Sequence, residues 1–392
     1  MSLHTISDTI ERALRSAGLD PATGPTRGVT ETIRRALASA GLVQHPTADP
    51  AAPTAHAPAA ADEPLAFVER VDRPAPADPV APARPAATPE ADRPARSARR
   101  AGAEPGVFLA RTHTGPAGSR AYKLYVPAGA ADDDAPRPLV VMLHGCKQHP
   151  DDFAAGTRMN ALADEHGFLV AYPAQSRNAN GSNCWNWFRP EDQRREGGEP
   201  AILAGIVADV VAAHRIDPAR VFVAGLSAGA AMAVILGQTH PELFAAIGAH
   251  SGLPSGAAHD VGSAFMAMNG AKSVFGAAPA RAAAPGGPRP RTIVFHGDED
   301  ATVVARNGEA IVAQALAGGT PLAAADATRG SAGGRAYTRT VHADEAGRAR
   351  VELWLLHGGA HAWSGGSPAG SYTDPRGPDA SAEMVRFFLQ AP

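Results

Sequence analysis

The sequence G-L-S-A-G at residues 225–229 has the residue types and spacing for nucleophilic catalysis. It follows a β-branched and aromatic run at 221–223 and precedes an Ala- and Met-rich segment, which predicts a strand, a tight turn and a helix. Such a turn strains its central residue, and only glycine leaves room two positions before and two after it. The start of a helix favours negative charge developing beside it. The motif therefore predicts Ser227 as the nucleophile of an acyl-transfer reaction.

A serine hydroxyl is a weak nucleophile without a base, and the base needs an acid that orients it. On a strand–serine–helix scaffold the chain order is serine, acid, histidine. Asp300 follows an apolar run at 292–295, where an acid at a strand end is expected. We choose it over Asp298, which we expect to cap the intervening turn.

The candidate base is His361, which lies on a glycine-flanked loop after the apolar run at 351–356. Such a loop can bring the imidazole over Ser227. His357 lies directly at the strand end, and we expect it to be structural. Ser227, Asp300 and His361 thus form a predicted catalytic triad.

Two backbone amides are needed to bind the oxyanion of a tetrahedral intermediate. One is expected from Ala228, directly after the nucleophile. The other is expected from the loop after the apolar run at 139–143, where Cys146 is the best candidate. Gly145 permits a close backbone approach, and His144 is interpreted as a structural residue that fixes the loop.

An aromatic cluster at 183–188, with the sequence N-C-W-N-W-F, lies in a segment rich in Gly, Asn and Ser. Aromatic residues in such loops line binding clefts, although an ordinary core cluster has the same composition. We predict that Trp185 and Trp187 line the substrate pocket and that Trp363 contributes to the same wall.

Residues 106–392 are predicted to form the catalytic domain, because apolar runs alternate with helical segments from there on. The expected strands are 121–126, 139–143, 168–172, 221–224, 246–249, 292–295 and 351–356, and the expected helices are 158–166, 201–214, 228–240, 306–317 and 380–389. This pattern predicts an α/β class with a mostly parallel sheet flanked by helices on both faces, and functional groups at the carboxyl ends of its strands. Together with the serine turn it predicts an α/β-hydrolase fold.

The N-terminal part differs in composition. Residues 9–19 and 32–42 form an internal repeat with helical apolar spacing, so we expect two short amphipathic helices within 1–45. These helices could pair as a hairpin, dock on the catalytic domain or lie on an apolar surface. Residues 46–105 hold thirteen of the 35 prolines and are predicted to be a disordered Pro/Ala-rich linker.

The net charge of −3 gives no reason to expect a nucleic acid partner. The sequence shows neither a signal-peptide pattern nor a run of about 20 apolar residues, so we expect no transmembrane segment and a cytoplasmic protein. Two cysteines, Cys146 and Cys184, leave a disulfide and two buried free thiols as equal alternatives. We expect no metal and no cofactor, because the histidines are scattered and no nucleotide-binding pattern occurs.

Several segments together closely resemble the poly(3-hydroxybutyrate) depolymerase family of esterases, which is related to feruloyl and acetylxylan esterases: LHGCKQHPDDF, NCWNWF, VAGLSAGAAM, HGDEDATV and HGGAHAWSGG. The resemblance covers roughly 107–390. It implies nucleophile, acid and base roles for Ser227, Asp300 and His361, an oxyanion role for the Cys146 amide, and a substrate groove shaped by Trp185 and Trp363. It also favours the Cys146–Cys184 bridge, since the family pairs cysteines near the site.

Secreted members of that family carry a signal peptide and often a C-terminal substrate-binding domain, whereas the appendage here is N-terminal and is predicted to be helical. The expected substrate is poly(3-hydroxybutyrate) or a short hydroxyalkanoate ester, with a feruloyl or acetyl ester of plant polysaccharide as the alternative. A granule-binding protein with a scaffold hydrolase domain is a second hypothesis, in which residues 1–45 contact the polymer granule. A peptidase on the same fold is the third. The expected location is the cytoplasm or the granule surface, and the alternative is export by another route.

Overall fold

The computed structural model describes residues 106–129, 135–270, 289–317, 322 and 325–390. The chain divides into two units, Met1–Arg96 and Ser97–Pro392, and all of these residues belong to the second. The helices predicted within 1–45 and the linker predicted at 46–105 lie outside the described residues.

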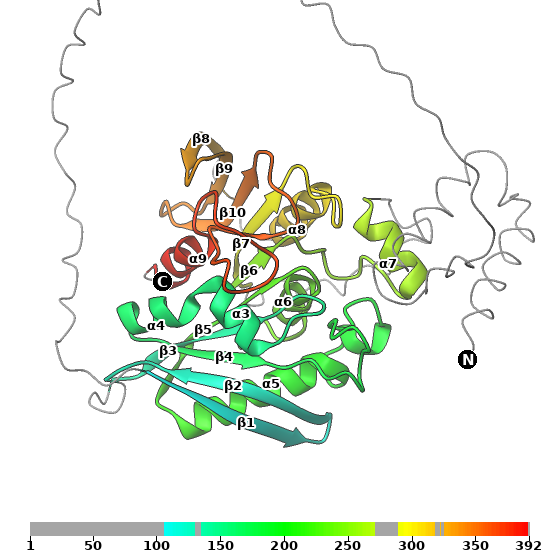
Figure 1. Ribbon diagram of the computed structural model, residues 1–392, viewed down its shortest axis with the longest axis vertical. Coiled ribbons are helices and arrows are strands. Elements are labelled where there is room, and N and C mark those ends of the chain that lie inside the picture. Colours follow the sequence, from blue (N-terminus) through cyan, green and yellow to red (C-terminus); the bar gives the residue numbers. More distant parts are fainter. Residues whose placement is uncertain (1–105, 130–134, 271–288, 318–321, 323–324, 391–392) are drawn as a thin grey trace, which may run out of the picture. The chain divides into compact units, whose positions relative to one another are not determined.

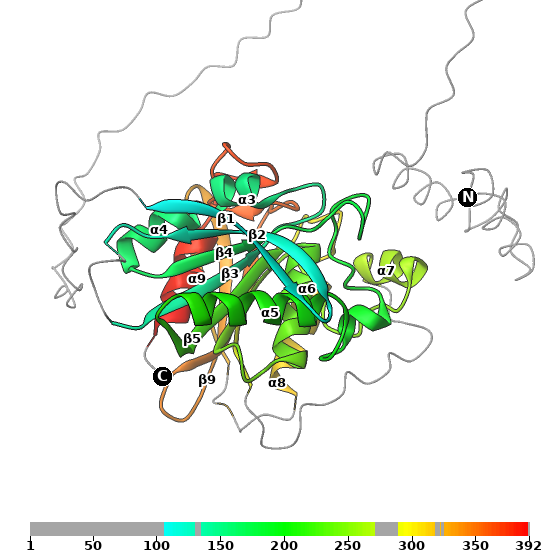
Figure 2. The ribbon, with the colours of Figure 1, turned by 90° about the horizontal axis from the view of Figure 1, so that it is seen from below.

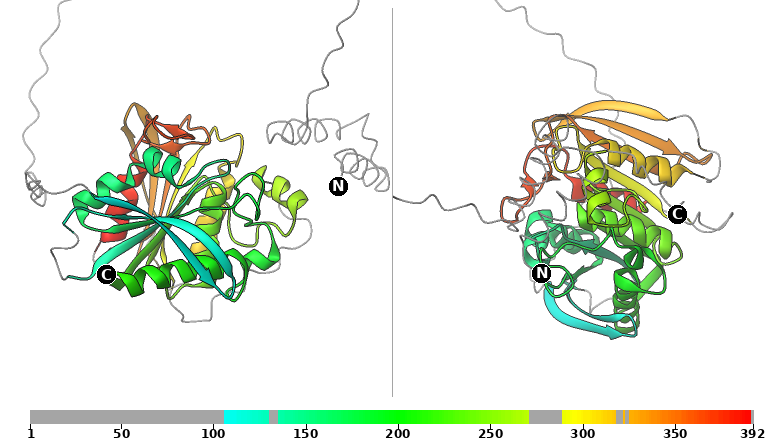
Figure 3. Two further views of the ribbon diagram at one scale, coloured as in Figure 1. Left: turned by 60° about the horizontal axis from the view of Figure 1, so that its bottom comes forward. Right: turned by 90° about the vertical axis from the view of Figure 1, so that its right-hand side faces the viewer.

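Ten strands of the described residues form one sheet, in the order β1-β2-β4-β3-β5-β6-β7-β10-β9-β8 (Figure 1). The central strands β4, β3, β5, β6, β7 and β10 run parallel to one another. The antiparallel strands β1 and β2 extend the sheet at one edge, and β9 and β8 extend it at the other. Their bounds are β1 Val107–Gly115, β2 Gly118–Val126, β3 Arg137–Leu143, β4 Leu169–Pro173, β5 Ile216–Leu226, β6 Ala246–His250, β7 Arg291–Gly297, β8 Asp326–Ala332, β9 Arg335–Ala343 and β10 Ala349–Leu356. Figure 3 shows the β1–β2 and β8–β9 hairpins at opposite edges.

Helices cover both faces of this sheet, as Figure 2 shows from below. One face carries α5 Gly198–Ala213, α6 Ala228–Thr239 and α8 Arg306–Leu316, and the other carries α3 Pro150–Thr157, α4 Met159–His166 and α9 Ala380–Leu389. The remaining short elements are the 3-10 helix Pro190–Gln193, α7 Val261–Met268, and the paired strands β11 Trp363–Ser364 and β12 Thr373–Asp374. No helix in the described ranges is long and apolar enough to cross a membrane.

The continuous apolar strands of the sequence follow from this two-sided cover. In β3, Leu139, Val141 and Leu143 pack in the core on one side, while Val140 and Met142 pack on the other, and all five are buried. A parallel strand buried on both faces needs an apolar residue at every position. The predicted α/β class with a mostly parallel, helix-covered sheet is therefore confirmed.

The differences from the predicted elements lie at the edges and in short helices. The edge strands β1, β8 and β9 and the helices α3 and α7 were not predicted from the sequence. The central strand β5 begins at Ile216 and is longer than the predicted 221–224. These changes leave the carboxyl ends of the central strands where they were expected.

Candidate active site

The carboxyl ends of β5, β6, β7 and β10 lie side by side at one edge of the sheet. Leu226 pairs in register with His250, and His250 pairs with Phe295. Leu356 at the end of β10 pairs with Gly297 at the end of β7. The loops that follow these strands carry the predicted nucleophile, acid and base, so the sheet assembles all three at this edge.

Ser227 occupies the turn between β5 and α6 with φ 56° and ψ −119°, a left-handed conformation that side chains rarely adopt. Every residue from 221 to 230 is buried except Ser227, which is partly exposed. Its amide donates to the carbonyl of His250 at 2.9 Å. The turn therefore presents one side chain of an otherwise buried segment to solvent.

The two glycines of the motif are required by close backbone packing. A Cβ on Gly229 would lie 2.1 Å from the Leu143 carbonyl oxygen, and one on Gly225 would lie 2.4 Å from the Gly229 carbonyl carbon. Neither clash can be relieved by a side-chain movement, because the neighbours are backbone atoms. The steric requirement expected from the sequence is confirmed.

Asp300 and His361 form a hydrogen-bonded pair, with 2.7 Å between Asp300 Oδ2 and His361 Nδ1. The Asp300 side chain is fully buried and that of His361 is 12% exposed. The other carboxylate oxygen, Oδ1, accepts from the amides of Thr302 at 2.9 Å and Val303 at 2.8 Å. Burial raises the pKa of Asp300, but the hydrogen bonds and the charge of His361 outweigh it and hold that pKa below its usual value. An ionised Asp300 thus fixes the imidazole with Nδ1 protonated and leaves Nε2 free to act as a base.

A second pair joins Asp298 and His357, the two neighbours that were not chosen as acid and base. Asp298 Oδ2 lies 2.9 Å from His357 Nδ1, and Asp298 Oδ1 accepts from the Gly358 amide at 2.7 Å. Their side chains are 36% and 39% exposed. This pair ties the loop after β7 to the loop after β10.

His250, which was not selected from the sequence, links Ser227 to the loop that carries His361. Its carbonyl accepts from the Ser227 amide, and its Nε2 accepts from the Ser364 amide at 3.0 Å. Complete burial lowers its pKa to about 3, so the ring is neutral and Nδ1 donates to Ser251 Oγ at 3.1 Å. His250 could have been selected from the sequence because it ends a buried strand and is followed by Ser251 and Gly252.

The loop after β3 contains the second candidate oxyanion donor. Gly145 donates its amide to Gln148 Oε1 at 2.9 Å, and Gln148 Nε2 donates to Ser371 O and to Asp152 Oδ2, both at 2.9 Å. Within the described residues, the amide of Cys146 has no protein acceptor. The same holds for the amide of Ala228, at the first position of α6. Both amides are therefore available to an oxyanion.

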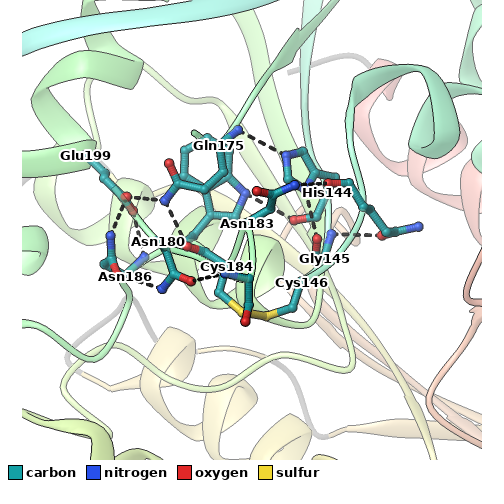
Figure 4. The surroundings of a disulfide bond; sticks show 12 residues. His144, Gly145, Cys146, Gln175, Asn180, Asn183, Cys184, Asn186 and Glu199 are labelled. Carbon is teal, nitrogen blue, oxygen red and sulfur yellow. Dashed lines mark hydrogen bonds between the residues drawn. A yellow bond between two sulfur atoms is a disulfide. The ribbon is translucent and has the colours of Figure 1, made fainter. Parts of the chain in front are cut away.

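Cys146 and Cys184 are joined in a disulfide, the alternative that the resemblance favoured (Figure 4). Beside it, His144 O accepts from Trp185 Nε1 at 3.1 Å, and His144 Nε2 accepts from the Gln175 amide at 3.1 Å. Burial lowers the pKa of His144 to about 4, so the ring is neutral. His144 thus fixes the loop, consistent with the structural role expected of it.

The three tryptophans predicted to bind substrate lie in the core. Trp185 is 0% exposed, Trp363 is 1% exposed, and Trp187 is 6% exposed. Trp363 stacks on His250 and donates from Nε1 to Ser381 Oγ at 3.0 Å. Trp185 and Trp363 pack beneath the loops of the site, and their contribution to a substrate wall stays a prediction. Trp187 packs edge-on against Phe188, and its contact with substrate stays a prediction.

No group of three or more His, Cys, Asp or Glu side chains in the described part of the chain could hold a metal ion.

Similarity to a solved structure identifies the fold class. An acetyl xylan esterase from Aspergillus awamori superimposes with a TM-score of 0.56 at 21% identity, covering 72% of this chain and 99% of that one. The likeness in structure and the serine turn between β5 and α6 show that the chain has the α/β-hydrolase fold.

The family follows from the sequence comparisons. The model of the esterase PHB depolymerase family matches residues 120–337, and the chain belongs to this family. Poly(3-hydroxyalkanoate) depolymerase C of Paucimonas lemoignei is 37% identical over 206 residues, covering 51% of this chain and 49% of that protein. Feruloyl esterase B of Neurospora crassa is 35% identical over 130 residues, covering 33% and 42%. The chain spans about half the length of the curated relatives it matches.

Proposed function

We propose that the protein is a serine carboxylic-ester hydrolase that works through an acyl-enzyme intermediate. The observation that carries this proposal is the buried Asp300–His361 pair at the strand edge that presents Ser227. Family membership supports it independently. The catalytic domain would then be residues 106–392.

In the proposed mechanism, His361 Nε2 takes the proton of the Ser227 hydroxyl as Ser227 Oγ attacks the ester carbonyl. The oxyanion accepts hydrogen bonds from the amides of Cys146 and Ala228. The intermediate collapses, His361 returns the proton to the leaving alcohol, and an acyl–Ser227 ester remains. Water, deprotonated by His361, then attacks the acyl group and releases the acid, with Asp300 stabilising the charged imidazole in both halves.

The proposed substrate is poly(3-hydroxybutyrate) or a short hydroxyalkanoate ester, because the polyhydroxyalkanoate depolymerase has a higher identity, over more residues, than the feruloyl esterase. A feruloyl or acetyl ester of a polysaccharide is the alternative, supported by the feruloyl esterase relative. No cofactor takes part in this chemistry. The proposed location is the cytoplasm or the surface of polymer granules, with residues 1–45 as the proposed granule contact, or outside the cell by another route.

The test measures acid release from amorphous poly(3-hydroxybutyrate) granules in parallel with p-nitrophenyl butyrate, methyl ferulate and acetylated xylan, with Ser227→Ala as the control. Release from granules that Ser227→Ala abolishes would support polymer hydrolysis. Cleavage of methyl ferulate or acetylated xylan without granule release would favour the alternative substrate. If folded protein cleaved no ester but sedimented with granules, the granule-binding scaffold would replace the proposed enzyme.

A further inference from the structure

Glu199, the second residue of α5, is a buried carboxylate that the proposed mechanism does not use. Its side chain is 4% exposed. Glu199 Oε2 accepts from the Asn186 amide at 2.7 Å, and Oε1 accepts from Asn186 Nδ2 at 2.8 Å and from Gln175 Nε2. Arg120 lies 3.8 Å away. Burial and the nearby charge of Asp192 raise the pKa of Glu199, and the hydrogen bonds from Asn186 and Gln175 and the charge of Arg120 offset part of that rise. Donors contact both of its oxygens, and α5 holds the carboxyl group at a fixed position.

The groups that donate to Glu199 belong to two chain segments beside the disulfide. Gln175 is in the segment after β4, and Asn186 follows Cys184 and Trp185. Gln175 Nε2 also donates to Cys184 O at 2.8 Å. Glu199 therefore fixes both ends of the stretch 175–186, as Figure 4 shows.

This stretch is tied in turn to the loop that carries the Cys146 amide. Trp185 Nε1 and the Gln175 amide both bond to His144, the disulfide joins Cys184 to Cys146, and the Lys147 amide donates to Ser182 O at 2.8 Å. These cross-links attach residues 144, 146 and 147 to the stretch that Glu199 holds. A chain of contacts therefore connects the Cys146 amide with the buried Glu199 carboxyl group.

We infer that Glu199 is a positioning residue for the oxyanion site: it holds Trp185 and Gln175 against His144 and so aims the Cys146 amide at the developing oxyanion. This inference rests on the proposed function. An oxyanion donor acts on charge that exists only in the transition state, so misplacing it lowers kcat and leaves KM nearly unchanged.

Glu199→Gln is the direct test, since it keeps the volume but replaces one acceptor oxygen with a donor that faces other donors. The matched control is Glu352→Gln. Glu352 is also fully buried and bonded by Arg339 and Arg386, but it lies in β10, before the carboxyl end of the strand. Both variants lose stability, so rates are expressed per folded molecule and KM is measured with p-nitrophenyl butyrate.

For Glu199→Gln we expect kcat to fall about 10- to 100-fold with KM within about twofold. The Ki of a trifluoromethyl ketone, whose anionic adduct on Ser227 mimics the intermediate, should rise in parallel with the loss of kcat/KM. Glu352→Gln should keep kcat and this Ki within about twofold of the wild-type values. A kcat for Glu199→Gln equal to that of Glu352→Gln, or a raised KM with unchanged kcat, would overturn the inference.

If Glu199→Gln does not fold, Trp185→Phe replaces it, because this change removes the donor to His144 and keeps a smaller aromatic ring in the core. A lowered kcat with unchanged KM supports the inference, and an unchanged kcat refutes it. If the wild-type protein cleaves no ester, the proposed function fails, and amide hydrogen exchange of 143–147 decides the positioning separately. Faster exchange there in folded Glu199→Gln than in Glu352→Gln supports positioning, and equal exchange contradicts it.

Discussion

Two aspartate–histidine pairs bridge the same two loops, and they differ in burial. Asp300–His361 and Asp298–His357 both join Oδ2 to Nδ1, at 2.7 and 2.9 Å. In the first pair the carboxylate is fully buried, and in the second both side chains are more than a third exposed. Water screens the exposed pair, whereas the buried carboxylate acts on its imidazole without competition. Similar geometry therefore fits the proposed catalytic role in one pair and a loop contact in the other.

The largest contrast is expected between the two histidines. His361→Ala should lower kcat/KM for p-nitrophenyl butyrate by roughly 10⁴-fold or more, because no base remains for Ser227. His357→Ala should change it by less than about threefold. Steady-state rates of the two purified variants check this, and comparable losses would show that the pairs are not functionally distinct.

The aspartates should show the next largest contrast. Asp300→Asn should reduce kcat about 10³- to 10⁴-fold, because an amide donor in place of the carboxylate disfavours the required imidazole tautomer. Asp298→Asn should stay within about threefold of wild type. Circular dichroism spectra establish that both variants are folded, so that the difference in kcat reports chemistry. A loss for Asp298→Asn equal to that for Asp300→Asn would contradict the distinction by burial.

Burial also predicts an acid-sensitive histidine beside the buried pair. The pKa of His250 is lowered to about 3 from an ordinary value of 6.5, so between these values the unfolded chain binds a proton that the folded chain does not. The free energy of unfolding should therefore fall as the pH decreases from 6.5, by about 1.4 kcal/mol per pH unit for this group. Urea unfolding between pH 6 and 4 should show a smaller slope in His250→Gln. Parallel slopes in the two proteins would disprove this contribution.

The smallest effect is expected for the stability contribution of the exposed pair. Removing the Asp298 charge by Asp298→Asn should lower the free energy of unfolding by no more than about 1 kcal/mol. Urea unfolding at pH 7 measures it. A loss of several kcal/mol would show that this pair is more important to the fold than its exposure suggests.

The sequence was sufficient to predict the central strands of the sheet, because strands buried on both faces must be apolar along their length. It was not sufficient to predict the edge strands. Strand β8, with the sequence DATRGSA, carries no large apolar side chain and is mostly exposed, so it shows no alternation. Helix α3 contains Gly156, which is there because a Cβ would lie 2.9 Å from Thr373 Cγ2, on a segment more than 200 residues later. Local patterns do not contain such contacts.

The same limit applies at the candidate site. Ser227, Asp300 and His361 could be selected because each follows an apolar run in a fixed chain order. The burial of Trp185 and Trp363 could not be foreseen, because aromatic residues in a polar loop have the same composition whether they face solvent or pack inward. In the sequence, Glu199 looks like an ordinary helix residue, because its contacts form only when the stretch 175–186 packs against it.

The conformation of Ser227 has a consequence for the balance between stability and activity. A side chain at φ 56° and ψ −119° costs on the order of 1–3 kcal/mol, which the rest of the fold must offset. Glycine adopts such a conformation without that cost, although it leaves the unfolded chain more flexible. Ser227→Gly should therefore be inactive yet more resistant to urea than Ser227→Ala, by about 1 kcal/mol. Selection for stability alone would remove the serine at the position where the proposed chemistry needs it.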